Sequence, residues 1–109
     1  MKVVIVDYGA GNIQSVLFAL ERQGVKALLS HDIKDIEKAD KVIFPGVGHA
    51  AAAMEKLQTS GIDQLLPQLT QPVLGICLGM QLMCNRSEEG NTKGLGIFDV
   101  EVKAFEARL

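Results

Sequence analysis

The chain has 109 residues, of which 48% are hydrophobic, 22% charged and 5% aromatic, and its formal net charge is −2. This composition is typical of one globular domain with a buried core, and it excludes a disordered chain. The near balance of acidic and basic side chains offers no field that would attract a nucleic acid or a membrane surface. No apolar run approaches the ~20 residues needed to cross a bilayer, and residues 1–7 lack the features of a signal peptide, so we expect a cytoplasmic protein.

Short apolar runs alternate with helical patterns along the first two thirds of the sequence. Buried strands are predicted at residues 3–6, 25–29, 41–44 and 73–76, and helices at 13–20, 32–38, 50–58 and 62–69. Asn12 is expected to cap the first helix and Gly24 to end it. The alternation predicts an α/β fold with a mainly parallel sheet and helices on both faces, that is, a flavodoxin-like three-layer sandwich.

The last part of the chain has a weaker pattern. Residues 87–96 predict a polar loop, and residues 97–105 predict a fifth strand. No later element would cover that strand, and an uncovered sheet edge is a liability in an intact domain. The sequence therefore predicts the N-terminal part of a truncated domain.

The segment from residue 73 to residue 81 has the form of a strand, then Gly-x-Cys-x-Gly, then a helix. This arrangement is typical of a nucleophile elbow, in which Gly75 and Gly79 let the strand and helix approach closely around Cys77. The start of the helix favours a thiolate, and the Leu78 amide is expected to face a tetrahedral oxyanion. A structural cysteine in a tight turn is the alternative.

Cys84 follows seven positions after Cys77 and is predicted on the same helix. The helical rise would then place the two Cα atoms about 10 Å apart, which is too far for a disulfide. Cys84 is therefore expected to be structural.

A second glycine-containing segment, Pro45-Gly46-Val47-Gly48, directly follows a predicted buried strand. Its backbone amides would lie at the same edge of the sheet as Cys77 and could bind an oxyanion. An ordinary turn between strand and helix is the alternative.

Together, residues 75–81 (GICLGMQ) and 45–48 (PGVG) resemble the class I, or triad, glutamine amidotransferases. Within that family, residues 7–12 (DYGAGN) and 87–90 (SEEG) are similar to the glutaminase subunits of imidazole glycerol phosphate synthase, which act in histidine biosynthesis. The resemblance covers nearly the whole chain.

This resemblance implies that the protein hydrolyses glutamine to glutamate and ammonia and needs no cofactor or metal. Cys77 would be the nucleophile, with Gly48 and Leu78 as oxyanion donors. Glutamine would be bound by Gly46, Gln81 and Glu89, the last offering a carboxylate to the substrate ammonium. The ammonia would pass to a partner cyclase subunit with a (β/α)₈ barrel, in contact with Gly11 and Asn12.

One departure from the family is clear. The family places its catalytic base and orienting acid in a His-x-Glu pair far after the cysteine, and this sequence has no such pair. Its two histidines, His31 and His49, both precede Cys77 and are expected at loops or helix starts. Family subunits are close to twice this length, so the chain is expected to be an N-terminal half or unable to complete the reaction alone.

Three other functions remain open from the residues. Gly9, Gly11 and Asp32 partly fit a dinucleotide-binding pattern, although Gln14 stands where glycine or alanine is expected. A cysteine-elbow hydrolase or chaperone of similar architecture would not need Gln81 or Glu89. A glutamine amidotransferase that serves another pathway is the third alternative. Only the segments that resemble the imidazole glycerol phosphate synthase branch argue against it.

Overall fold

The structure is a computed structural model that describes residues 1–10 and 13–105. Its centre is a four-stranded parallel sheet with the order β2-β1-β3-β4, which is the order found in flavodoxin-like folds. The strands are β1 (Val3–Val6), β2 (Ala27–Ser30), β3 (Lys41–Phe44) and β4 (Val73–Gly75). The predicted α/β fold with a mainly parallel sheet is confirmed.

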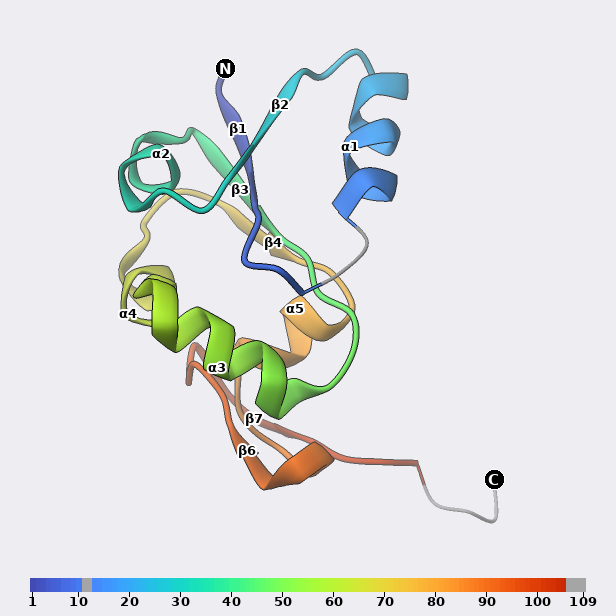
Figure 1. Cartoon of the computed structure of the whole chain (residues 1–109), viewed down its shortest axis with the longest axis vertical. Helices are drawn as coiled ribbons and strands as arrows, with labels where there is room; N and C mark the ends of the chain where they lie inside the picture. The colour runs from blue at the N-terminus through green and yellow to red at the C-terminus, as the bar shows by residue number, and fades with distance from the viewer. Residues whose placement is uncertain (11–12, 106–109) are drawn as a thin grey trace.

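Helices cover both faces of this sheet (Figure 1). One face carries α1 (Ile13–Arg22), and the other carries α2 (Ile33–Lys38), α3 (Ala50–Ser60) and α4 (Ile62–Leu65). Successive residues of a strand point to opposite faces, so Val3 and Ile5 pack with α1 while Val4 and Val6 join the larger core. The predicted three-layer sandwich is therefore present.

Several helix ends follow from local residues. Asp32 caps α2 by accepting a hydrogen bond from the Lys34 amide at 2.8 Å. Gly24 follows α1 with a φ of +77°, as expected for a helix terminator. The next amide, of Val25, donates to Leu20 O at 2.9 Å and closes α1. Because the Val25 amide is bonded to α1, β2 begins two positions later than predicted.

The helix predicted at residues 62–69 is divided. The four residues of α4 are followed by a short 3₁₀ helix, η1 (Leu66–Gln68). Pro67 has no amide to continue an α-helical ladder, which explains the change in helix type.

The C-terminal third differs from the prediction in two ways. After α5 (Leu78–Leu82), Cys84 begins a strand and is not on the helix with Cys77. The remaining elements are β5 (Cys84–Ser87), η2 (Glu89–Asn91), β6 (Thr92–Lys93) and β7 (Phe98–Val102). The strand predicted at 97–105 is β7, but it pairs in parallel with β5 in a separate sheet of order β6-β5-β7.

Backbone hydrogen bonds explain why α5 stops. The carbonyl of Leu82 accepts the Leu95 amide at 2.8 Å, and the carbonyl of Met83 accepts the amides of Ile97 and Phe98 at 2.9 and 3.0 Å. The segment after the loop therefore takes the carbonyls that a longer helix would have used. A contact between residues so far apart in sequence leaves no signal in local periodicity.

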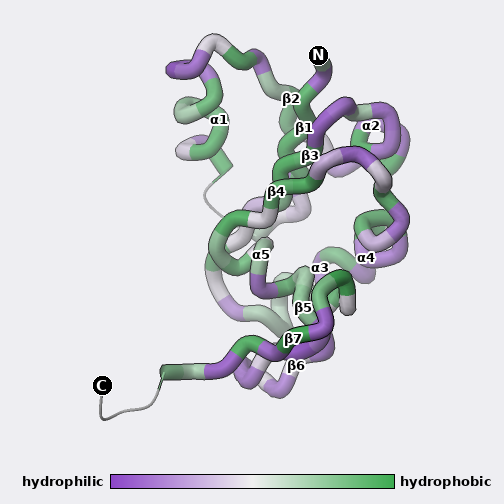
Figure 2. The backbone as a smooth tube through the Cα atoms, turned by 180° about the vertical axis from the view of Figure 1, so that it is seen from behind, coloured by the Kyte–Doolittle hydropathy of each residue, from purple (hydrophilic) through white to green (hydrophobic). Residues whose placement is uncertain are grey.

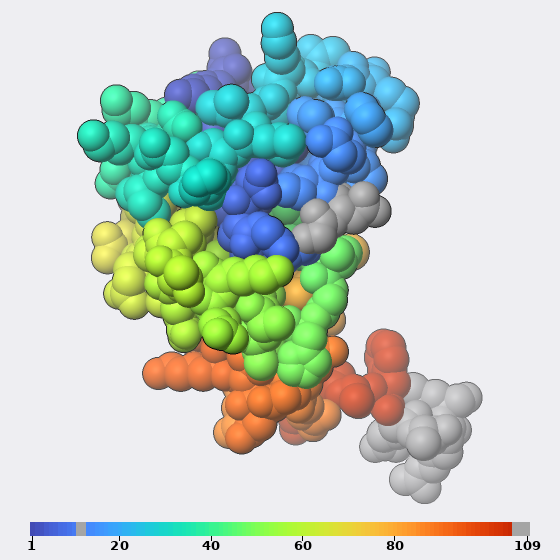
Figure 3. All heavy atoms as spheres, in the orientation of Figure 1, coloured from blue at the N-terminus to red at the C-terminus, as the bar shows by residue number. Residues whose placement is uncertain are grey.

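Burial differs strongly between strands. β1 is buried on both faces as predicted, and Figure 2 shows β1 and β3 as hydrophobic segments between α1 and α2. The prediction is wrong for β2 and β4, the two edge strands of this sheet among the described residues, where Leu28 is 44% and Leu74 is 59% exposed. β7 is mostly exposed, and residues 103–105, which follow it, extend away from the body of the molecule (Figure 3).

Candidate active site

Cys77 sits on a strained turn between β4 and α5. Its backbone has a φ of 54° and a ψ of −124°, a region that residues with a Cβ rarely adopt. The side chain is exposed, so the thiol is accessible. This is the geometry expected of a nucleophile elbow, and it differs from that of Cys84, which is buried.

The two flanking glycines are required by close contacts. A Cβ atom at Gly75 would lie 2.7 Å from Met80 Cα, and one at Gly79 would collide with the carbonyl oxygen of Phe44. The expectation that small residues let strand and helix approach is confirmed at both positions.

A cavity of about 250 Å³ lies beside Cys77. Its lining is mainly apolar and comes from the ends of β1, β3 and β4 and the start of α1. The lining residues are Val6, Tyr8, Ala10, Ile13, Ser15, Pro45, Gly46, Val47, Ile76 and Cys77. The predicted nucleophile and the predicted substrate-binding Gly46 therefore share one cavity.

The segment 45–48, which follows β3, is bonded to the elbow. The Ile76 amide donates to Phe44 O, and the Leu78 amide donates to Gly46 O, both at 3.0 Å. The Leu78 amide is therefore already engaged by the protein, contrary to the expectation that it faces an open oxyanion position. To donate to a substrate oxygen, the Leu78 amide would have to break its hydrogen bond to Gly46 O.

Gly48, the other predicted oxyanion donor, has a φ of +99° and open space where a Cβ would lie. It lines a second, shallower depression with Gly9, Ala10 and His49. Val47 borders both this depression and the Cys77 cavity. Within the described part of the chain, Gly48 is thus next to the cavity but not on its wall.

Glu89 is brought to the start of α3. Its Oε1 accepts the Ala50 amide at 2.7 Å, although 39 positions separate the two residues. His49 Nδ1 accepts the Ala51 amide at 3.2 Å, which confirms the predicted helix-start role of this histidine. The Glu89 carboxylate, which is predicted to bind the substrate, therefore lies at the start of α3, close to the end of segment 45–48.

Gln81 lies one helical turn after Cys77, and its amide donates to Cys77 O at 3.2 Å. Among the residues that the structure describes, neither Gln81 nor Glu89 lines the Cys77 cavity. Gly11 and Asn12, the predicted partner contacts, lie outside the described residues.

Tyr8 and Lys56 were not predicted from the sequence as part of this region. The Tyr8 hydroxyl donates to Pro45 O at 2.8 Å, and Lys56 Nζ donates to Gly9 O at 2.6 Å. Burial raises the pKa of Tyr8 well above its usual range, so the hydroxyl stays protonated and remains a donor. The available signal was that both residues come just after adjacent strands, Tyr8 two positions beyond β1 and Pro45 directly after β3.

Across residues 1–10 and 13–105, no group of three or more His, Cys, Asp or Glu side chains is arranged to hold a metal ion. In the same residues, every helix is too short or too polar to cross a membrane.

The sequence matches the profile of the CobB/CobQ-like glutamine amidotransferase domain over residues 3–109. The chain belongs to this family. The match agrees with the resemblance inferred from the elbow and the PGVG segment, and it decides against a dinucleotide-binding module.

Relatives of this amidotransferase domain include subunit HisH of imidazole glycerol phosphate synthase. The chain is 57% identical over 108 residues to the protein of that name from Bacteroides fragilis, covering 99% of this chain and 55% of the relative. It is 52% identical over 103 residues to that from Idiomarina loihiensis, covering 94% and 53%. The chain thus spans about half the length of the curated relatives it matches.

A solved structure described as a glutamine amidotransferase superposes on 92% of this chain and 55% of its own, with a TM-score of 0.78. The sequence identity is 20%, so this likeness supports the fold. The amidotransferase domain described here therefore has the architecture expected for its family.

Proposed function

We propose that this chain is the cysteine-bearing part of a glutaminase subunit of imidazole glycerol phosphate synthase, acting in histidine biosynthesis. The observation that carries the proposal is the exposed Cys77 thiol on a strained turn, beside a cavity that it shares with Gly46. The identity to HisH proteins supports the assignment to this branch.

In the proposed reaction, the Cys77 sulfur attacks the side-chain amide carbon of glutamine and forms a tetrahedral intermediate. The carbon–nitrogen bond then breaks, and the nitrogen leaves as ammonia after it receives a proton. A water molecule attacks the resulting γ-glutamyl thioester, releasing glutamate and restoring the thiol. Because the attack creates an oxyanion, donors must be positioned before the reaction.

The oxyanion donors are proposed to be the amides of Gly48 and Leu78. The position of a Cβ at Gly48 is open, while the Leu78 amide must first release the Gly46 carbonyl. Gln81 and Glu89 are proposed to bind the amino-acid part of glutamine. Glu89 uses one carboxylate oxygen for the Ala50 amide, so the other can accept a bond from the substrate ammonium.

The ammonia is proposed to pass to a (β/α)₈-barrel cyclase subunit that contacts Gly11 and Asn12. The sequence has no His-x-Glu pair after Cys77 to serve as base and orienting acid. We therefore expect negligible turnover of glutamine by the 109-residue chain, even when the partner is supplied.

The test is covalent labelling with 6-diazo-5-oxo-norleucine, a glutamine mimic with an electrophilic carbon, followed by mapping of the adduct by mass spectrometry. The expected product carries the adduct at Cys77, and Cys77→Ala abolishes it. Cys84, which is buried, serves as an internal control that stays unmodified. Labelling at Cys84, or no labelling of the wild-type chain, contradicts the proposal.

A further inference from the structure

We propose that Tyr8 is a positioning residue, whose hydroxyl holds segment 45–48 at a fixed place relative to Cys77. The proposal deepens the glutaminase function proposed above and rests on it. Tyr8 follows β1, whereas segment 45–48 follows the adjacent strand β3.

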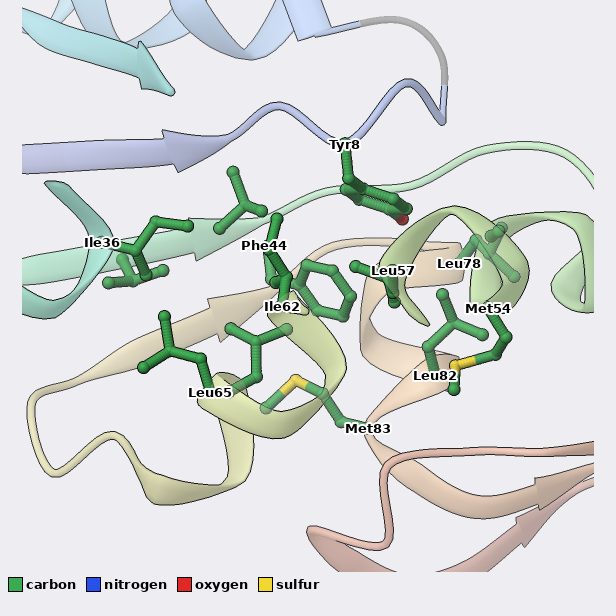
Figure 4. Packing of buried hydrophobic residues seen from close by; sticks show 14 of the residues in the cluster. Tyr8, Ile36, Phe44, Met54, Leu57, Ile62, Leu65, Leu78, Leu82 and Met83 are labelled. Atoms are coloured by element: carbon green, nitrogen blue, oxygen red, sulfur yellow. The ribbon is translucent and has the colours of Figure 1, made fainter. Parts of the chain in front are cut away.

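Tyr8 is held both by packing of its ring and by the hydrogen bond of its hydroxyl. The side chain is buried, and its ring centroid lies 5.3 Å from that of Phe44, with the planes tilted by 37°. Figure 4 shows Tyr8 at the edge of the core cluster, with its oxygen at the far end of the ring. Packing against Phe44 therefore fixes the point from which the hydroxyl reaches Pro45.

The hydroxyl controls the peptide unit that enters the segment. Its 2.8 Å bond goes to the carbonyl oxygen of Pro45, which belongs to the peptide group between Pro45 and Gly46. The next carbonyl, of Gly46, accepts the Leu78 amide of the elbow at 3.0 Å. Two consecutive carbonyls thus connect Tyr8 to the residue that follows Cys77.

Gly46 is enclosed between these same groups. A Cβ atom there would lie 2.5 Å from the Tyr8 oxygen and 2.8 Å from the Gly79 amide nitrogen. The segment therefore contacts Tyr8 on one side and the elbow on the other. Since Tyr8 also lines the cavity beside Cys77, a shift of its hydroxyl would change the cavity wall directly.

Phenylalanine at position 8 would keep the ring contact and remove the bond to Pro45. The fold would remain, because the buried ring would still pack against Phe44, and the Val47 amide would still donate to Ala10 O at 3.0 Å. The expected consequence of Tyr8→Phe is local: segment 45–48 becomes less restrained, so the Gly48 amide is less well positioned as an oxyanion donor and the glutamine mimic reacts more slowly with Cys77.

The first measurement is amide hydrogen exchange by NMR on the 109-residue chain. Tyr8→Phe is expected to speed exchange at Val47, Gly48 and Leu78 about tenfold, and to change the β1 amides of Val4 and Ile5 less than about twofold. The matched control is Thr59→Val, which removes a hydroxyl bond to Glu55 O within α3 and should leave all of these rates unchanged.

The second measurement compares two reagents on the same variants. Reaction of Cys77 with 6-diazo-5-oxo-norleucine is expected to slow about tenfold in Tyr8→Phe, while reaction with iodoacetamide, which needs no oxyanion site, stays within about twofold. Tyr8→4-aminophenylalanine restores a donor at the same place and should recover most of the lost rate.

The outcomes separate the two proposals. Unchanged exchange at Val47, Gly48 and Leu78 overturns the role of Tyr8, and so does faster exchange with an unchanged rate for the glutamine mimic. A wild-type Cys77 that reacts with iodoacetamide but never with the glutamine mimic overturns the glutaminase function. In that case the exchange rates alone still decide whether Tyr8 holds the segment.

Discussion

The elbow at residues 75–79 and the small sheet at residues 84–102 are close in sequence but are held in place differently. The elbow is defined by backbone contacts in a packed region, since neither Gly75 nor Gly79 can carry a Cβ without a collision. The small sheet is defined mainly by backbone hydrogen bonds, and its β7 side chains are largely exposed. The proposed nucleophile is therefore fixed by the core, whereas the proposed substrate carboxylate, Glu89, is held by a more exposed segment.

The largest expected effect compares phenylalanines in the two sheets. Phe44 is fully buried, so Phe44→Ala should lower the free energy of unfolding by about 3–5 kcal/mol. Phe98 on β7 is 48% exposed, and Phe98→Ala should lower it by less than about 1 kcal/mol. Urea denaturation followed by circular dichroism measures both. Equal losses would show that the small sheet contributes to the core as much as β3 does.

The next effect concerns the elbow itself. Alanine usually favours a helix over glycine by about 1 kcal/mol, but the Phe44 carbonyl occupies the place of the new methyl group. Gly79→Ala is therefore expected to lower the free energy of unfolding by about 1–3 kcal/mol. Met80→Ala, at the neighbouring and half-exposed position, is the control and should change it by less than about 1 kcal/mol. A stabilised Gly79→Ala variant would refute the close-contact explanation.

The smallest effect on stability is expected at Glu89. Glu89→Gln removes a negative charge from the start of α3 and should lower the free energy of unfolding by about 0.3–1 kcal/mol. The rate of Cys77 labelling by the glutamine mimic should fall about tenfold, because the substrate ammonium loses its charged partner.

Glu88→Gln is the matched control for that prediction. Glu88 also accepts a backbone amide, from Ala104 at 2.9 Å, and it directly precedes Glu89. Its substitution should leave the labelling rate unchanged. Equal losses of rate in the two variants would indicate a general effect of the loop and not recognition by Glu89.

The sequence was sufficient to predict the parallel sheet and the elbow because their signals are local. Apolar runs mark β1 and β3, and Gly75 and Gly79 mark the turn at Cys77. The small sheet could not be predicted, because β5 exists through pairing with β7 and carries no apolar run of its own. The helix predicted for Cys84 is wrong for the same reason.

Within the site, the sequence predicted that Cys77 and Gly46 lie together, but not that Gly48, Gln81 and Glu89 lie off the wall of their cavity or how the polar groups pair. It could not show that the Leu78 amide is taken by the Gly46 carbonyl, or that Tyr8 reaches Pro45. Such bonds depend on small rotations of peptide groups, which residue types do not determine. The contact of Glu89 with the start of α3 likewise depends on the unpredicted path of residues 84–93.

The backbone of Cys77 has an evolutionary consequence. A residue with a Cβ in such a sparsely populated region costs roughly 1–3 kcal/mol, and glycine would avoid most of that cost. Drift under selection for stability alone would therefore replace this cysteine with glycine. Descendants that no longer need the thiol should lose it early, so a cysteine retained at this turn marks a lineage in which the chemistry is still under selection.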